Sequence, residues 1–167
     1  RSLFFNKALV EQYLLDDPYA LVDEGKWTMD RFTEMCLAVV ADLDGDGAMT
    51  DADRYGYVAY GELIADILLY GMNERYIGKD PDTGMVTDLS GDERFLNAYD
   101  KIINLTVTQQ DAAFDVRAKN RSKYLNGLGD RAQEPMFTEN KALFYSECMA
   151  WSRVLREMEA DFGVLPP

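Results

Sequence analysis

The stretch NKALFYSECMAWSRVLREME, residues 140–159, contains the transition that decides the fold. The apolar run 142–145 has the length of a buried strand, and the segment 149–159 carries apolar residues at helical spacing. A strand followed closely by a helix is the repeating unit of α/β proteins. We therefore predict a strand over 142–145 and a helix over 149–159, joined by a short loop.

The same unit occurs twice upstream of this stretch. Residues 3–5 predict a strand, and Asn6 is a suitable cap for a helix over 7–15. Residues 55–59 predict another strand, followed by a helix over 61–72. The other predicted elements are helices over 18–25, 28–43 and 91–108, a hairpin pairing 75–78 with 85–87, an irregular excursion over 109–133 with a helical piece near 111–120, and a last strand over 163–165. The predicted class is α/β, a helix-rich single lobe with a small central sheet.

Composition and charge exclude several classes of function. The 167 residues correspond to one domain, and 17 Lys+Arg against 30 Asp+Glu leave a net charge of −13. We find no basic stripe, so we expect no nucleic-acid partner, because phosphate recognition depends on cationic side chains. The chain has no histidine, which excludes Ser-His-Asp triads, Cys-His pairs and histidine zinc sites from this segment. Its apolar residues, 47%, suffice for a folded core.

Other features concern the thiols and the chain ends. Cys36 and Cys148 each lie in a helical or core-like run, so we expect two reduced thiols. No apolar run approaches the roughly 18 residues that a membrane span needs, and the start has no signal-peptide pattern. Because the chain starts at Arg1 without a methionine and ends at Pro167 directly after an apolar run, we expect residues 1–167 to be a single domain cut from a longer protein.

An acidic loop at residues 42–53 has the spacing of a calcium-binding loop. Oxygen-bearing side chains occupy loop positions 1, 3, 5, 9 and 12, and glycine occupies position 6. Calcium binds six to eight hard oxygen ligands, so this pattern predicts one Ca²⁺, more plausible here than Mg²⁺ and with a structural role. The predicted ligands are Asp42, Asp44, Asp46, the Ala48 carbonyl and Asp53.

Two features of this loop leave alternatives open. Asp53 stands where an EF-hand usually has glutamate, and its shorter side chain favours one-sided and weaker binding. A solvated, metal-free acidic turn is the alternative interpretation. No second loop of this kind is present, which argues against a calcium sensor, because sensors move one helix against another.

Three segments together resemble a known family. They are LFFNKALVEQYLLDDPYALVDEGKWTMDRF at the start, the DLDGDG loop followed by DRYGY, and NKALFYSECMAWSRVLREMEADFGVLP at the end. In this order they resemble the extracellular solute-binding proteins of ATP-binding-cassette (ABC) importers, in the large carbohydrate-binding group. The resemblance covers essentially the whole chain.

The resemblance implies a fold and a function. The fold would be the second lobe of a type II periplasmic-binding-protein clamp, with the first lobe and a C-terminal part missing. The protein would capture a sugar or oligosaccharide without breaking bonds and deliver it to the permease subunits of an ABC importer. It would be an extracellular or periplasmic monomer, reaching the membrane only through a lipid anchor outside this segment.

The resemblance also implies a ligand site, on two loops that follow strands. The first loop would contribute Tyr60 and Glu62, and the second would contribute Ser146, Glu147, Met149 and Trp151. Many family members have a glycine and an aromatic residue in the second loop, whereas this chain has Glu147, Cys148 and Met149 there. For Trp151 and Tyr60 the alternative is core packing, and for the two glutamates it is a solvated surface.

Two other functions compete with solute binding. A calcium-dependent carbohydrate-active enzyme would use two of the 30 acidic residues as acid and base, although no motif singles out a pair. A calcium-loop interaction module, similar to a dockerin, would need a second loop, and only one is present. We therefore predict a non-catalytic binding protein.

Overall fold

The computed structural model describes residues 2–61, 63–109, 111–115 and 132–166. Seven strands are described: β1 (Ser2–Asn6), β2 (Tyr55–Ala59), β3 (Ile77–Lys79), β4 (Val86–Asp88), β5 (Ala113–Asp115), β6 (Ala142–Glu147) and β7 (Phe162–Leu165). The α-helices in these ranges are α1 (Lys7–Gln12), α2 (Pro18–Asp23), α3 (Met29–Ala38), α4 (Leu63–Gly71), α5 (Glu93–Ile103) and α6 (Gln133–Thr138). A π-helical turn, η1 (Asn104–Thr108), follows α5, and a 3₁₀-helix, η2 (Met149–Glu157), follows β6.

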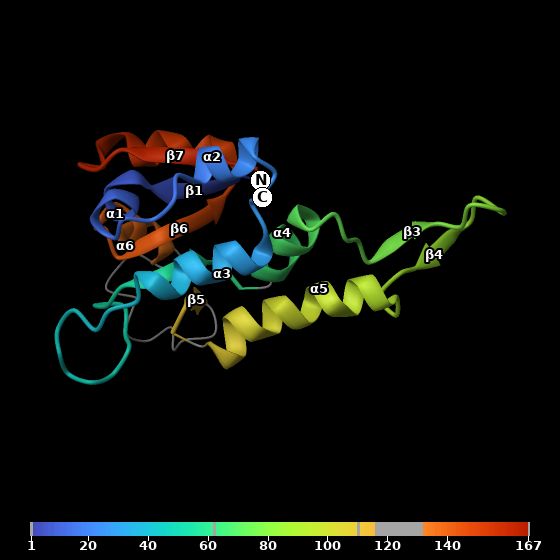
Figure 1. Ribbon diagram of the computed structural model, residues 1–167, viewed down its shortest axis with the longest axis horizontal. Coiled ribbons are helices and arrows are strands. Elements are labelled where there is room, and N and C mark those ends of the chain that lie inside the picture. Colours follow the sequence, from blue (N-terminus) through green and yellow to red (C-terminus); the bar gives the residue numbers. More distant parts are fainter. Residues whose placement is uncertain (1, 62, 110, 116–131, 167) are drawn as a thin grey trace.

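A five-stranded sheet forms the core of the fold, in the order β5-β2-β6-β1-β7. Figure 1 labels its strands β5, β6, β1 and β7. Strand β2 runs parallel to both β5 and β6, whereas β1 is antiparallel to β6 and β7. The sheet is thus mixed, with crossover connections between its parallel strands. The strands β2, β5 and β6 end at the edge where β1 begins, which confirms the predicted α/β class.

Both faces of the sheet are buried, and alternate residues of each strand serve opposite faces. Phe5, Tyr57 and Phe144 belong to the cluster that packs against helices α1 to α5. Phe4, Val58 and Tyr145 belong to the other cluster, which packs against α6 and η2. Aromatic rings pack closely in the first cluster, where the ring centroids of Phe32 and Phe144 lie 4.7 Å apart.

Helix α3 lies directly on β2 at one position. A Cβ atom added to Gly56 would overlap the backbone and side chain of Cys36. Glycine is therefore required at position 56 by this close approach of two backbones. The contact fixes α3 and β2 relative to each other, on either side of the acidic loop that joins them.

Side-chain caps mark the starts of two predicted helices. The side chain of Asn6 accepts the N–H of Leu9, so the predicted cap is present. Thr28, where a helix was predicted to begin, also acts as a cap, because its side chain accepts the N–H of Arg31. Gly25 has φ +67° just after α2, as a helix-terminating glycine requires. The predicted hairpin is also present as β3 and β4, and it projects away from the body of the fold (Figure 1).

Several predicted boundaries were wrong. The helix predicted over 7–15 ends at Gln12, and the helix predicted to reach Leu43 ends at Ala38. Strand β6 continues to Glu147, so Ser146 and Glu147 lie in the strand rather than in a loop. The segment 149–157 is a 3₁₀-helix rather than an α-helix.

The excursion predicted over 109–133 contains two elements near its ends. Residues 113–115 form strand β5 where a helical piece was predicted, and helix α6 begins at Gln133. The rest of that predicted segment, 116–131, lies outside the described residues. Within the described ranges, no helix is long and apolar enough to cross a membrane.

Candidate functional site

The carboxyl ends of the parallel strands converge on one edge of the sheet. The register pairs Ala59 of β2 with Asp115 of β5, and Leu3 of β1 with Ser146 of β6. Ligands of open α/β sheets bind at the carboxyl ends of strands, where the connecting loops gather. We call the row of Asp115, Tyr60, Ser146, Glu147 and the start of η2 the ligand edge.

Ser146 is a buried member of this edge. Its residue is only 4% exposed, and its Oγ lies 2.6 Å from the Oη of Tyr57. This pair of hydroxyls links β6 to β2 and satisfies both groups inside the sheet. The structure thus places Ser146 beneath the surface that a ligand would touch.

The turn after β2 contains the predicted residue Tyr60, which is half-buried. The next residue, Gly61, has φ +52° and donates its N–H to the Asp115 carboxylate at 2.8 Å. Sequence reasoning missed Asp115, because a strand of three residues in a polar segment carries almost no periodic signal. The predicted residue Glu62 lies outside the described residues.

The second predicted group surrounds the end of β6. Glu147 is partly exposed, and its Oε1 accepts the N–H of Cys148 at 2.9 Å. Met149 is 54% exposed at the start of η2. Trp151 is half-buried, with the guanidinium carbon of Arg153 5.9 Å from its ring centroid, a cation–π distance. Glu147 ends β6, and Met149 and Trp151 lie at the start of η2, so all three belong to the ligand edge as defined above.

The fold also contains an apolar cavity of about 380 Å³ between α3, α4 and α5. Trp27, Met29, Leu68 and Met72 contribute to its lining. The predicted ligand residues that the structure describes do not line it, but Leu3, the strand partner of Ser146, does.

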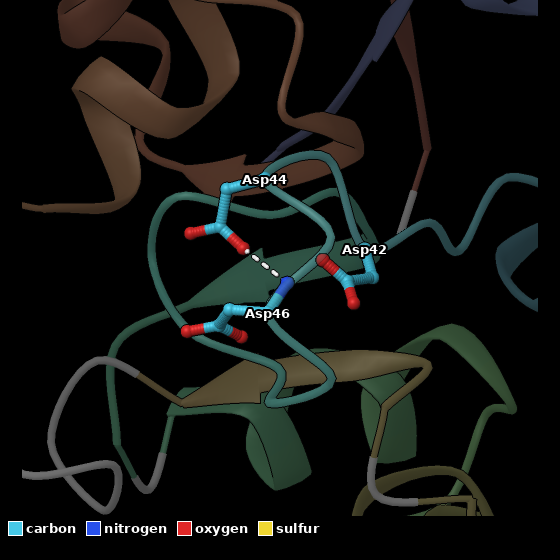
Figure 2. A group of neighbouring side chains, drawn as sticks. All are labelled: Asp42, Asp44 and Asp46. Carbon is cyan, nitrogen blue, oxygen red and sulfur yellow. Dashed lines mark hydrogen bonds between the residues drawn. The ribbon is translucent and has the colours of Figure 1, made fainter.

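The acidic loop brings three of its predicted ligands together (Figure 2). Oxygens of Asp42, Asp44 and Asp46 all lie within 4.8 Å of one another, and all three residues are exposed. Each carboxylate also accepts backbone N–H groups of the loop, such as that of Gly47 by Asp42 at 2.9 Å. Carboxylate oxygens at this spacing are a donor set that suits a hard cation such as Ca²⁺.

The surroundings of Asp44 raise the pKa of its carboxyl group. The largest single effect on Asp44 is a hydrogen bond from the N–H of Asp46, which lowers its pKa. Desolvation and the charges of Asp46, Asp53 and Asp42 act in the opposite direction, and the net result is a raised pKa. The loop thus concentrates negative charge that a bound cation would neutralise.

Asp53 occupies a different place from the other three aspartates. It is fully buried, and it accepts the N–H of Leu43 at 2.8 Å and the N–H of Thr50 at 2.7 Å. Desolvation is the largest effect and raises its pKa, but the hydrogen bonds from Thr50 and Leu43 outweigh it, so the pKa is lowered. Asp53 therefore closes the loop with its own hydrogen bonds, whether or not it also contacts an ion.

Comparisons with known proteins concern the fold of the chain. Neither a family model nor a curated protein matches the sequence. Among solved structures, an ABC substrate-binding protein from Listeria monocytogenes in complex with cycloalternan matches with a TM-score of 0.62 at 12% identity, over 98% of this chain and 35% of that chain. The maltose/maltodextrin-binding domain MalE from Bdellovibrio bacteriovorus, bound to maltotriose, matches with a TM-score of 0.60 at 17% identity, over 98% and 35%. A solute-binding protein from Thermotoga lettingae, bound with alpha-D-tagatose, gives 0.62 at 15% identity, over 98% and 37%.

These matches establish the fold. The chain has the fold of part of the ABC substrate-binding proteins, which confirms the resemblance predicted from the sequence. It spans little more than a third of the length of the three structures above, 35–37%. The proteins matched in this way are binding proteins rather than enzymes.

Proposed function

We propose that this chain is the second lobe of a two-lobed solute-binding protein that captures a sugar or oligosaccharide for an ABC importer. The observation that carries the proposal is the convergence of β2, β5 and β6 on one edge, in a fold shared with sugar-binding proteins. The longer protein would work outside the cytoplasm, with any lipid anchor outside this segment. Its direct partners would be the ligand and the permease.

The chemistry of the ligand edge suits a hydroxyl-rich ligand. Carboxylates such as Glu147 accept hydrogen bonds from sugar hydroxyls, and charge-assisted bonds of this kind are the stronger ones. Trp151 and Tyr60 offer aromatic surface, and Met149 adds an exposed apolar side chain that adapts to irregular shapes. These groups bind and orient a ligand, and the proposed function requires no bond breaking.

We also propose that the acidic loop holds one structural calcium ion. Asp42, Asp44 and Asp46 would supply carboxylate oxygens, with the Ala48 carbonyl and Asp53 completing the site. The proposal is supported by the grouping of the three carboxylates within 4.8 Å. Met49, at the eighth loop position, packs against the core cluster that contains Tyr55, so the loop is anchored on the apolar side.

Glycan titration of two proteins tests the sugar-binding proposal: this chain, and a longer protein that contains it. Good ligand sites bury roughly 70–90% of the ligand, so one lobe alone should bind weakly and the two-lobed protein tightly. In the longer protein, Trp151→Ala or Glu147→Ala should weaken binding by about 1–3 kcal/mol. Glu34→Ala is the matched control, since Glu34 pairs with Arg31 on the exposed side of α3.

Three results would contradict the proposal. Equal affinity of the isolated chain and the longer protein would exclude a clamp. Weakening by Glu34→Ala alone would mean that the ligand binds at another face. Glycoside turnover abolished by one carboxylate substitution would favour the enzyme alternative instead.

A further inference from the structure

Strand β5 brings a carboxylate to the ligand edge from a distant part of the sequence. The strand pairs in parallel with β2, with Ala113 opposite Tyr57 and Asp115 opposite Ala59. Paired residues of neighbouring strands point to the same face. Ala59 and Ala113 both belong to the cluster that packs against α1 to α5, so Asp115 lies on the face from which α4 rises.

The Asp115 carboxylate holds one end of a short turn. Its Oδ1 accepts the N–H of Gly61 at 2.8 Å, across 54 residues of sequence. The C=O of Gly61 accepts the N–H of Ile64 at 3.1 Å, in the first turn of α4. Both polar groups of Gly61 are thus engaged, one by β5 and the other by α4.

The backbone conformation of the turn is one that glycine adopts without strain but does not hold by itself. Gly61 has φ +52°, in the left-handed region, and Tyr60 immediately precedes it. A negative charge near the start of a helix is also favourable, because the helix dipole is positive there. Asp115 therefore stabilises both the conformation of the turn and the start of α4.

We propose that Asp115 is a positioning residue of the ligand edge: by accepting the Gly61 N–H it fixes the Tyr60–Gly61 turn in the orientation that presents Tyr60 to a ligand. The importance of this orientation for binding rests on the proposed function. Asp115 acts through Gly61, so its effect on a ligand is indirect.

Two substitutions of Asp115 distinguish its role as a hydrogen-bond acceptor from the effect of its charge. A core amide measured alongside reports any general loss of stability. Asp115→Ala removes the acceptor, whereas Asp115→Asn keeps an oxygen acceptor at the same place and removes the charge. Asp88→Asn is the matched control, because Asp88 accepts the N–H of Ser90 at 2.9 Å on the projecting hairpin. Amide hydrogen exchange is measured by NMR on the ¹⁵N-labelled chain, at Gly61 and at the core residue Phe144.

In Asp115→Ala the exchange of Gly61 should accelerate about tenfold, as expected for the loss of one hydrogen bond, while Phe144 stays unchanged. Asp115→Asn should restore slow exchange, and Asp88→Asn should leave Gly61 unaffected. Unchanged Gly61 exchange in Asp115→Ala would overturn the proposal, as would equal acceleration in Asp115→Asn. Acceleration of Phe144 to the same extent would also overturn it, because the effect would then be global.

A second measurement requires no variant. A scalar coupling between the Gly61 amide nitrogen and the Asp115 carboxyl carbon of the wild-type chain would demonstrate the hydrogen bond directly. Its absence would overturn the proposal even if Asp115→Ala fails to fold.

Maltotriose at millimolar concentration provides a separate test of function. It should shift the Tyr60 and Gly61 amide resonances of the wild-type and Asp115→Asn chains, and shift them less in Asp115→Ala. If no ligand-edge resonance moves in the wild-type chain while Gly61 exchange responds as expected, maltotriose binding fails and the positioning of the turn stands. Equal maltotriose shifts in the wild-type chain and in Asp115→Ala would overturn the link between the turn and binding.

Discussion

The buried carboxylate of Asp53 accepts the backbone N–H of Leu43 at 2.8 Å, across ten residues of sequence. The other oxygen of the same carboxylate accepts the N–H of Thr50 at 2.7 Å. The Asp53 side chain therefore joins the beginning of the acidic loop, at Leu43, to its later part, at Thr50. We therefore expect the stability of the loop to depend on pH even without an ion, because protonation of Asp53 weakens both hydrogen bonds.

Asp53→Ala should destabilise the chain at neutral pH. The substitution leaves the Leu43 and Thr50 N–H groups without their acceptor, at a cost of about 1–3 kcal/mol. Because the pKa of Asp53 is lowered on folding, its contribution is present above about pH 4 and is lost as the pH falls through its folded-state pKa. Urea unfolding without calcium, at neutral pH and at about pH 2.5, measures the difference between the variant and the wild type.

The destabilisation should shrink as the pH falls through the folded-state pKa of Asp53, because protonation removes the charge that the Leu43 and Thr50 N–H groups bind. Asp51→Ala is the control, since it changes a neighbouring carboxylate that the structure does not bury. A penalty for Asp53→Ala that is the same at both pH values would show that the charge of the carboxylate plays no part.

In the calcium-free chain, Asp44→Asn should stabilise the folded state, whereas Asp53→Ala destabilises it. The pKa of Asp44 is raised on folding, so its ionised form is disfavoured in the folded state, and its contribution to stability is lost as the pH rises through that pKa. Removing this charge should raise the melting temperature at neutral pH and have little effect at about pH 2.5. Thermal unfolding in the presence of a chelator measures this shift.

Calcium should reverse the order of the melting temperatures of the wild-type chain and Asp44→Asn. An ion that binds only the folded state raises the melting temperature of the wild type, and Asp44→Asn and Asp46→Ala should lose that increase. Asp80→Asn is the control, because hydrogen bonds from Thr83 lower the pKa of Asp80 in the hairpin turn, outside the acidic loop. A full calcium response in Asp46→Ala, or no calcium binding at millimolar ion, would contradict the proposed site.

Much of the fold could be predicted because its signals are local. Asn6, Thr28 and Gly25 each act on residues within one helical turn, so the sequence around them carries the information. The acidic loop is local as well, which explains why the grouping of Asp42, Asp44 and Asp46 was foreseen. Strand β5 was not foreseen, because its three residues are specified by pairing with β2, more than 50 residues away.

The candidate site was only partly predictable for the same reason. The end of β6 depends on the partners of its last residues, and pairing of Ser146 with Leu3 and of Glu147 with Ser2 extends the strand into the predicted loop. The hydrogen bond between Tyr57 and Ser146, which buries Ser146, also joins residues far apart in sequence. Hydrophobic patterning does not report such cross-strand contacts.

Gly56→Ala should be among the most destabilising single-methyl changes in the chain. The new Cβ would overlap the Cys36 backbone, so α3 would have to move away from β2, at a cost of about 1–3 kcal/mol or more. Gly91→Ala is the matched control, since an added Cβ there meets no atom within 4 Å and needs no unusual φ. Chemical denaturation of both variants measures the difference. A Gly56→Ala chain as stable as Gly91→Ala would contradict the close approach.

The two thiols should differ in reactivity. Cys36 is fully buried and burial raises the pKa of its thiol, whereas Cys148 is partly exposed at the ligand edge. A maleimide reagent should therefore label one site in the folded chain and both in denaturant, because the exposed thiolate is the reactive form. Mass spectrometry identifies the labelled residue. In the longer protein a bound sugar should slow labelling of Cys148, and labelling of Cys36 in the folded state would contradict the buried position.

Strand β2, which contacts Cys36 through Gly56, connects two different regions of the molecule. The acidic loop enters β2 at its beginning, and the ligand edge lies at its end. Since the core fixes α3 and β2 on either side of the loop, carboxylates can be gained or lost between 42 and 52 without moving Ala59 or Tyr60. Substitutions in the acidic loop can therefore change the stability of the chain while the backbone at the ligand edge stays in place.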